Sequence, residues 1–253
     1  MEAFLYLVIC AVVFMLGACM GSFFNVLLCR IPNKEDFVKT RSHCPVCGKT
    51  LKWYELVPVF SYITQRGRCR NCLARIKTRY LLMELICGAA ALWAFMALGL
   101  TYETVLAFIL FPVLVSLSSE DIKKTEIPYW CTGVIAALGV ISTALSAVLP
   151  GKSLWYEHLI GMFVISVPFA VFCYMGAMGG GDVQLTAAAG LVLGWAIVPS
   201  VLIAMITGGV FGIIIKLTKK RATICFGPFL SIGIAAGYLY GYEIIKWYAS
   251  FLR

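Results

Sequence analysis

Charged residues are scarce in this chain. Only 13% of its 253 residues are Asp, Glu, Lys or Arg, whereas 61% are hydrophobic. A soluble domain carries about 25% charged residues, so this chain lacks the polar side chains that a water-facing surface needs. The composition therefore excludes an ordinary soluble domain and predicts an all-α, polytopic integral membrane protein.

We expect no cleavable signal peptide. The first apolar run, residues 3–29, contains no charge, and no small-residue cleavage site precedes Arg30. A signal peptide would have a basic start and a shorter apolar stretch. We expect the run to be retained as a membrane helix, because about 20 apolar residues cross the hydrocarbon core. About eight such runs are present, with no clear internal repeat: 3–29, 80–98, 104–119, 129–149, 158–175, 183–198, 200–215 and 224–246.

Basic residues predict the orientation of these spans. Twelve of the 21 Lys and Arg lie in residues 30–79, two more are Lys123 and Lys124, and four fall in 216–221. With both termini outside, these 18 lie on the cytoplasmic side and only three lie outside, as the positive-inside rule requires. We therefore attribute the net charge of +9 to basic residues in cytoplasmic loops, where they can also contact lipid headgroups. We expect no nucleic-acid partner.

Four of the eleven cysteines form two C-x-x-C pairs in the soluble segment 30–79. These are Cys44 with Cys47 and Cys69 with Cys72, and 21 residues intervene between the pairs. Such spacing is typical of a structural Cys₄ zinc site, whose metal would also stabilise a segment too small for a core of its own. Disulfides are the alternative, but they are rare in the cytoplasm.

Two aspartates lie where predicted spans meet the cytoplasm. Asp121 ends the third span, and Asp182 follows Gly179-Gly180-Gly181 at the start of the sixth, 61 residues later. Ionisable groups at membrane depth are functional candidates. Two carboxyl groups held close together cannot both ionise easily, which supplies one base and one acid for activating water. The pattern predicts the catalytic pair of an aspartyl protease.

Other interpretations of these acids exist. Asp182 could cap the helix that follows it, and Asp121 could pair with Lys124 one turn away. Glu120 and Glu126 are rival catalytic candidates, although we expect both to reach solvent. The pair could also serve a proton-coupled transporter, but the repeated halves typical of transporters are absent. A membrane scaffold built around the zinc segment would leave the Gly-x-Gly-Asp pattern unexplained.

These motifs resemble, in order and along nearly the whole chain, the bacterial type IV prepilin peptidase / N-methyltransferase family. Besides the cysteine pairs, the matching pieces are residues 21–26, 30–32, 55–59, 66–69, 79–80, 84–85, 121–128, 179–183 and 226–229. Four positions depart from the family's pattern, at Leu81, Tyr129, Gln184 and Cys225, and none of these is a proposed catalytic or metal-binding residue.

The resemblance implies a bifunctional enzyme of a bacterial inner membrane. It implies that Asp121 and Asp182 cut the basic leader from prepilin or pseudopilin-like precursors at the cytoplasmic face. A second activity would methylate the new amino terminus with S-adenosylmethionine, helped by Gly67 and Glu84 as donor-site residues. The implied parts are a first helix (1–29), the methylation-associated zinc segment (30–79) and the peptidase helices (80–253). A peptidase without methylation is the main alternative within the family.

Overall fold

The computed structural model describes residues 2–34, 36, 41–148, 154–218 and 225–251. Six basic residues used in the topology argument lie outside these ranges, namely Lys39, Lys152, Lys219, Lys220, Arg221 and Arg253.

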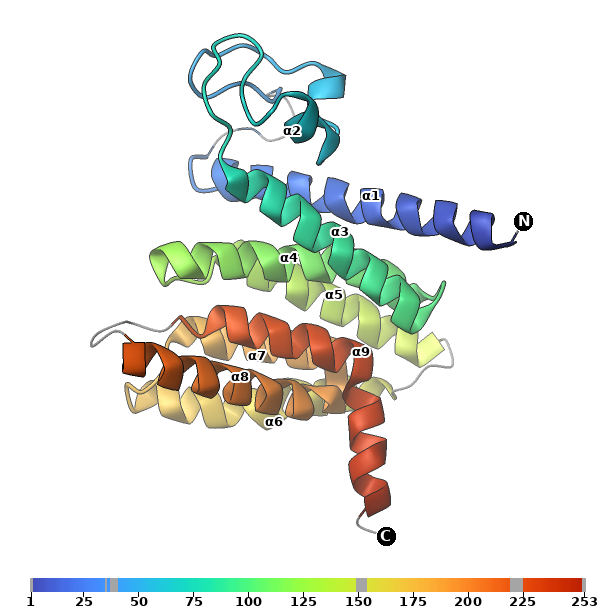
Figure 1. Cartoon of the computed structure of the whole chain (residues 1–253). Helices are drawn as coiled ribbons and strands as arrows, with labels where there is room; N and C mark the ends of the chain where they lie inside the picture. Colours follow the sequence, from blue (N-terminus) through green and yellow to red (C-terminus); the bar gives the residue numbers. More distant parts are fainter. Residues whose placement is uncertain (1, 35, 37–40, 149–153, 219–224, 252–253) are drawn as a thin grey trace. The chain divides into compact units, whose positions relative to one another are not determined.

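The described residues form helices and two isolated β-bridges, with no strand among them. The helices are α1 (Glu2–Arg30), α2 (Phe60–Thr64), α3 (Thr78–Leu98), α4 (Tyr102–Lys124), α5 (Tyr129–Val148), α6 (Trp155–Tyr174), α7 (Gly180–Leu193), α8 (Ile197–Thr218) and α9 (Gly227–Phe251), with short 3-10 turns at η1 (Trp53–Glu55) and η2 (Gly194–Ala196) (Figure 1). The eight long helices correspond to the eight apolar runs, which confirms the all-α polytopic prediction.

By length and composition, the described helices include six candidate membrane spans. The sixth, Gly180–Leu217, contains both α7 and α8. Helix α7 alone has 14 residues, about 21 Å of helix, and is shorter than the roughly 30 Å hydrocarbon core. Helix α9 is not among the six.

The break between the last two short spans differs from the prediction. The sequence placed it at Pro199-Ser200, but the structure places it at η2. Gly194 takes a left-handed φ of +59°, which suits glycine and turns the chain. Pro199 lies in the first turn of α8, where its missing N–H costs no helical hydrogen bond.

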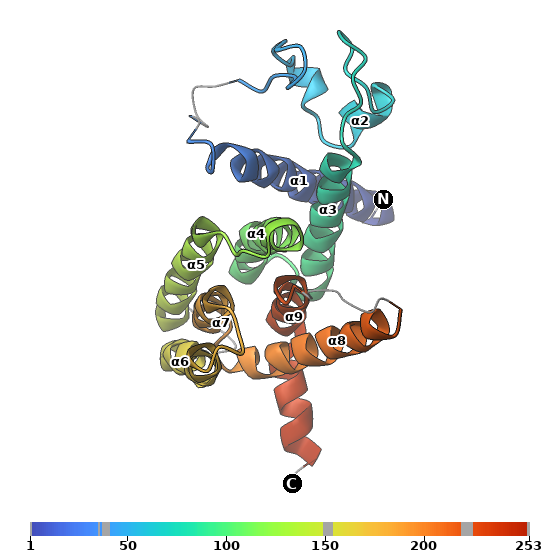
Figure 2. The same ribbon diagram turned by 90° about the vertical axis from the view of Figure 1, so that its left-hand side faces the viewer.

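The chain divides into two compact units, residues 1–116 and 117–253, with α4 running from one into the other. In the first unit α1 packs on α3 through small residues. A Cβ on Gly17 would collide with Ala91, and one on Gly21 would lie 2.7 Å from the Cβ of Cys87. This Gly-x-x-x-Gly pair lets the two helices approach closely, as small residues do between membrane helices. The soluble segment 31–77 connects them (Figure 2).

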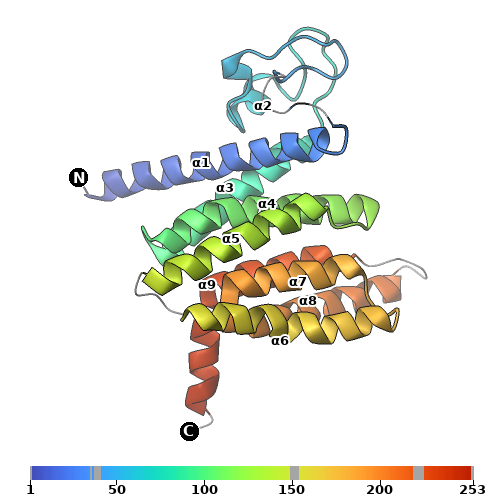
Figure 3. The ribbon, with the colours of Figure 1, turned by 180° about the vertical axis from the view of Figure 1, so that it is seen from behind.

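In the second unit, α7 packs between α5 and α6, and α9 packs against α8 (Figures 2 and 3). The α9 contact is a seam of glycines four residues apart, at Gly233, Gly237 and Gly241. These face Ala196, Ser200 and Ala204, and a Cβ on any of the three glycines would collide with this surface. The close packing fixes the start of α9 beside the ends of its neighbours, which positions the candidate site.

Candidate active site and metal centre

Three helix ends meet at one edge of the second unit. Asp121 lies in the last turn of α4 and is only 5% exposed. Asp182 lies in the first turn of α7, and Gly227 is the first residue of α9. In Figures 1 and 3 the end of α4 and the starts of α7 and α9 lie on the same side. The two sequence-predicted aspartates are therefore brought to one site.

The two carboxyl groups interact. Asp182 is within electrostatic range of Asp121, so each acid opposes ionisation of the other. The backbone N–H of Gly227 donates a 2.9 Å hydrogen bond to Oδ2 of Asp121. Because this N–H belongs to the N-terminus of α9, the positive end of the helix dipole also faces the Asp121 carboxyl. Asp182 has the same advantage at the N-terminus of α7.

Gly227 is a positioning residue that the sequence analysis did not single out. A Cβ at this position would lie 2.6 Å from Oδ2 and 3.0 Å from Cγ of Asp121, so only glycine admits this approach. The contact joins residues 106 positions apart. The only signal in the sequence was the Phe-Gly-Pro-Phe motif at 226–229, which was noted for its family resemblance alone.

The structural alternatives for the two aspartates do not hold. The N-cap of α7 is Gly179, and Asp182 lies within the first turn and does not cap the helix. Lys124 binds Glu120 at 3.4 Å, not Asp121. The N-cap role and the Lys124 pair are therefore not observed, although Asp182 lies in the first turn of α7, where the helix dipole favours an acid.

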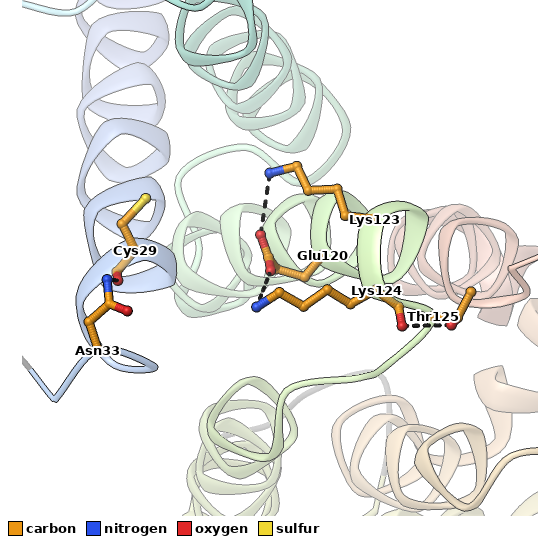
Figure 4. Close-up of polar contacts among 6 residues, drawn as sticks. All are labelled: Cys29, Asn33, Glu120, Lys123, Lys124 and Thr125. Atoms are coloured by element: carbon orange, nitrogen blue, oxygen red, sulfur yellow. Dashed lines mark hydrogen bonds and ion pairs between the residues drawn. The ribbon is translucent and has the colours of Figure 1, made fainter. Parts of the chain in front are cut away.

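Glu120 corrects one expectation. It was predicted to reach solvent, yet its residue is only 7% exposed. Lys123 and Lys124 hold its two carboxylate oxygens at 3.5 Å and 3.4 Å (Figure 4). Both oxygens of Glu120 are thus engaged by lysines, whereas Asp121 accepts the Gly227 N–H. Glu126 is exposed, as expected.

Local backbone geometry keeps the site open beside Asp182. Helix α4 ends at Thr125, which takes a left-handed φ of +54° and donates its N–H to the Asp121 carbonyl at 2.8 Å. Gly181 packs on Ile127, where a Cβ would lie 3.0 Å from the isoleucine Cβ. In contrast, a Cβ on Gly179 would meet only the Asp182 carboxyl, at 3.8 Å. No other heavy atom is found within 4 Å of a Cβ at this position.

The four predicted metal ligands lie together in the first unit. The sulfur atoms of Cys44, Cys47, Cys69 and Cys72 are all within 4.8 Å of one another. Tetrahedral zinc with Zn–S bonds of about 2.3 Å needs sulfurs about 3.8 Å apart, and Sγ of Cys44 and Cys72 are separated by 3.9 Å. The thiolate set therefore fits a closed, structural zinc site.

Each cysteine pair sits on the same backbone turn. The N–H of Cys44 donates to the Lys49 carbonyl, and 25 residues later the N–H of Cys69 donates to the Ala74 carbonyl, both at 2.9 Å. The β-bridges His43–Thr50 and Arg68–Arg75 repeat the same offset. Gly48 and Leu73 occupy the same left-handed position, with φ of +68° and +57°. The segment is thus a pair of equivalent knuckles, a short repeat that the sequence analysis missed because only the cysteines are identical.

Hydrogen bonds prepare two of the thiols for metal. The Lys49 backbone N–H, followed by the Asn71 side chain, lowers the pKa of Cys47 to about 6. The backbone N–H groups of Cys72 and Asn71 lower the pKa of Cys69. Metal binding requires thiolates, so both effects favour occupation of the site near neutral pH.

Glu84 and Gly67 both shape this first unit. Glu84, only 8% exposed, accepts the Val59 N–H at 2.8 Å and so ties the soluble segment to α3. Gly67 has φ of +65°, and its N–H and C=O both bond within the segment, to Tyr62 and Ile76. Glu84 thus anchors the segment and Gly67 shapes one of its turns, and their predicted part in methyl-donor binding stays a prediction.

Comparison with known proteins agrees with this arrangement. The bacterial peptidase A24 N-terminal domain matches residues 15–98, and the type IV leader peptidase family matches residues 108–213. No solved structure matches significantly.

Several relatives share the name prepilin leader peptidase/N-methyltransferase. The chain is 36% identical to that of Myxococcus xanthus over 83% of its own length, and it spans 64% of that relative. It is 30% identical to the Bacillus subtilis protein over 94% of its own length and 97% of the relative. The Aeromonas salmonicida protein is also 30% identical, with 95% and 94% covered. The chain therefore belongs to the type IV leader peptidase family, an aspartic peptidase family, and carries its bacterial N-terminal domain.

Proposed function

We propose that this protein is a prepilin leader peptidase that removes the leader of pilin-like precursors and then methylates the new amino terminus. The main observation in support of the peptidase activity is the Asp121–Asp182 pair, which lies where three helix ends meet. The backbone N–H of Gly227 donates a hydrogen bond to Asp121. The names of the relatives support both halves. The substrates are membrane precursors of the pilin or pseudopilin kind, and the setting is a bacterial inner membrane.

The pair would act as complementary acid and base on one water molecule. The ionised aspartate takes a proton as the water oxygen bonds to the scissile carbonyl carbon, and the protonated aspartate gives its proton to the carbonyl oxygen. When the C–N bond breaks, the leaving amine takes up the proton first removed from water. The titrations belong to the pair because the two groups are coupled.

One contact supports an assignment of the starting roles. The Gly227 N–H and the N-terminus of α9 favour a negative charge on Asp121. With Asp121 ionised, Asp182 faces a like charge and retains its proton. Asp121 would then act first as the base, and Asp182 would act first as the acid beside the open space at Gly179.

The same edge of the second unit would face the cytoplasm. Lys123 and Lys124 lie in the last turn of α4, and Lys216 lies in the last turn of α8. Basic residues gather at cytoplasmic membrane boundaries. The leader would therefore be cut on the side where pilin-like precursors carry it.

Methylation is proposed for the first unit. When bound, S-adenosylmethionine supplies the methyl group. The chain's own contribution would be the zinc-stabilised segment 31–77, kept in shape by Gly67, and the buried Glu84 carboxylate.

Replacing Asp121 or Asp182 separately with Asn should lower the rate of leader cleavage by roughly 10³-fold or more, because general acid–base catalysis is lost while side-chain size is kept. Cleavage of a purified prepilin by the reconstituted protein, followed by mass spectrometry, measures this. Glu126→Gln, which removes an exposed acid from the same region, is the control and should cut normally. Near-parental cleavage by either Asn variant would rule out the two-aspartate mechanism.

Metal analysis of the purified protein should find about one zinc per chain, as a single Cys₄ site requires. Cys69→Ser should remove most of it, because Cys69 belongs to the four-sulfur group. Cys10→Ser, which alters a cysteine outside that group, should leave zinc content unchanged. A folded, active protein without metal would contradict a structural role for the site.

Glu84→Gln tests whether the charge at this position serves methylation. The Gln oxygen can still accept the Val59 N–H, so the segment remains tied to α3. We expect methylation to fall more than cleavage, measured together by mass spectrometry of processed prepilin with and without S-adenosylmethionine. Equal losses of both activities would instead show that Glu84 acts only in folding.

A further inference from the structure

The knuckle segment (residues 31–77) exposes a group of apolar side chains that neither the peptidase nor the metal site uses. Four of them lie on η1 and α2 or between these elements. The exposed fractions are 77% for Trp53, 44% for Leu56, 60% for Phe60 and 63% for Ile63. Phe60 and Ile63 are three residues apart and share one face of α2. We call these four residues the interfacial face.

The position of α2 along the membrane helix gives the depth of this face. Val59, directly before α2, donates its N–H to Glu84 at 2.8 Å. Glu84 lies six residues after Thr78, where α3 begins, which is about 9 Å along the helix axis. Helix α3 is a candidate membrane span. The start of α2 therefore lies beside the second turn of a candidate membrane helix, close to the helix end where headgroups are expected.

The figures show the same placement within the first unit. In Figures 1 and 3 much of the knuckle segment lies alongside the C-terminal part of α1, with α2 next to the helices. Both ends of the segment are fixed, to α1 at Arg30 and to α3 at Thr78. The lipid surface is therefore always within reach, at high effective concentration.

Charge selects the kind of lipid. Among the described residues of the knuckle segment, nine basic side chains are exposed, and Asp36 is the exposed acid. Near the interfacial face, Arg70 and Lys52 lie 5.2 Å and 5.8 Å from the centre of the Tyr54 ring. Aromatic rings with cations beside them are typical of the boundary between headgroups and acyl chains. An anionic headgroup surface matches this charge, because basic residues close to a membrane are attracted to anionic lipids.

We propose that the interfacial face inserts into the anionic lipid surface of the leaflet next to the segment, with Lys52 and Arg70 on lipid phosphates. The knuckle segment is then a membrane-docked domain rather than a free cytoplasmic loop, and the bilayer restricts its position over the membrane. The apolar side chains enter about 5–10 Å, the depth typical of interfacial helices.

Site-specific photocrosslinking tests the docking. Benzoylphenylalanine is placed at position 60 or 63 of the full chain, which is reconstituted in phosphatidylcholine vesicles containing phosphatidylglycerol and irradiated. Positions 46 and 73 are the matched controls, because Val46 and Leu73 are equally exposed, at 69% and 68%, but lie on the knuckles. Lipid adducts, detected by mass spectrometry, should form at 60 and 63 and be largely lost at 46 and 73. Equal yields at all four positions, or adducts at 60 and 63 to a protein partner instead of lipid, would overturn the proposal.

A second experiment tests whether docking requires anionic lipid. Hydrogen–deuterium exchange of residues 53–64 should slow when phosphatidylglycerol is added to phosphatidylcholine vesicles. Lys52→Gln with Arg70→Gln should abolish that slowing, and zinc content confirms that the variant keeps its fold. Exchange that is unchanged by phosphatidylglycerol in the parental protein would contradict anionic-lipid binding.

Discussion

In the proposed mechanism, the peptidase activity depends on one electrostatic constraint, the repulsion between Asp121 and Asp182. Two negative charges close together would be costly. The structure reduces this cost in two ways. The N-termini of α7 and α9 direct positive dipole ends at the pair, and Gly227 donates a hydrogen bond to Asp121. In the proposed mechanism, burial and the remaining repulsion favour a single proton shared by the pair, which acid–base catalysis requires.

Much of the second unit serves to keep these helix ends together. The glycine seam of α9 on α8 sets where α9 begins, and Gly181 packs the start of α7 on Ile127. Glu120 would add a third charge beside the pair, but Lys123 and Lys124 bind it. The small residues therefore affect the electrostatics of the site as well as the packing. Larger side chains in the glycine seam would move the N-terminus of α9, with its helix dipole, away from the aspartates.

The first unit follows a different principle. Its soluble segment has little apolar core, and its shape depends on four thiolates and on backbone hydrogen bonds within two equivalent knuckles. Glu84 then fixes this shape to α3 through Val59. The proposed methylation would thus use a part stabilised by metal and tethered to lipid-embedded helices, whereas the proposed proteolysis uses helix termini.

The sequence predicted what depends on composition and local spacing. Eight apolar runs became eight long helices, and the C-x-x-C pairs came together as expected. The sequence-based prediction was wrong at one helix boundary, and it missed a contact between residues far apart in the chain. The break before α8 moved from Pro199 to Gly194, because proline is tolerated in a first helical turn while Gly194 adopts the left-handed φ that the turn needs.

The role of Gly227 was missed because it depends on a contact with a residue far away in the sequence. Its partner Asp121 lies 106 residues away, and no local pattern reports such a bond. Glu120 was expected in solvent because it ends an apolar run, yet its burial depends on two lysines that follow it. The Gly17–Gly21 spacing did carry a readable signal for close helix packing, but only the structure identified α3 as the partner.

The most direct measurement is the pH dependence of single-turnover leader cleavage by the protein in lipid vesicles. If one aspartate must be ionised and the other protonated, the rate should fall on both the acid and the alkaline side of an optimum, and Asp182→Asn should not retain the alkaline limb. A rate that rises to a plateau and stays there at high pH would show that no protonated carboxyl is needed, which would contradict a shared-proton pair.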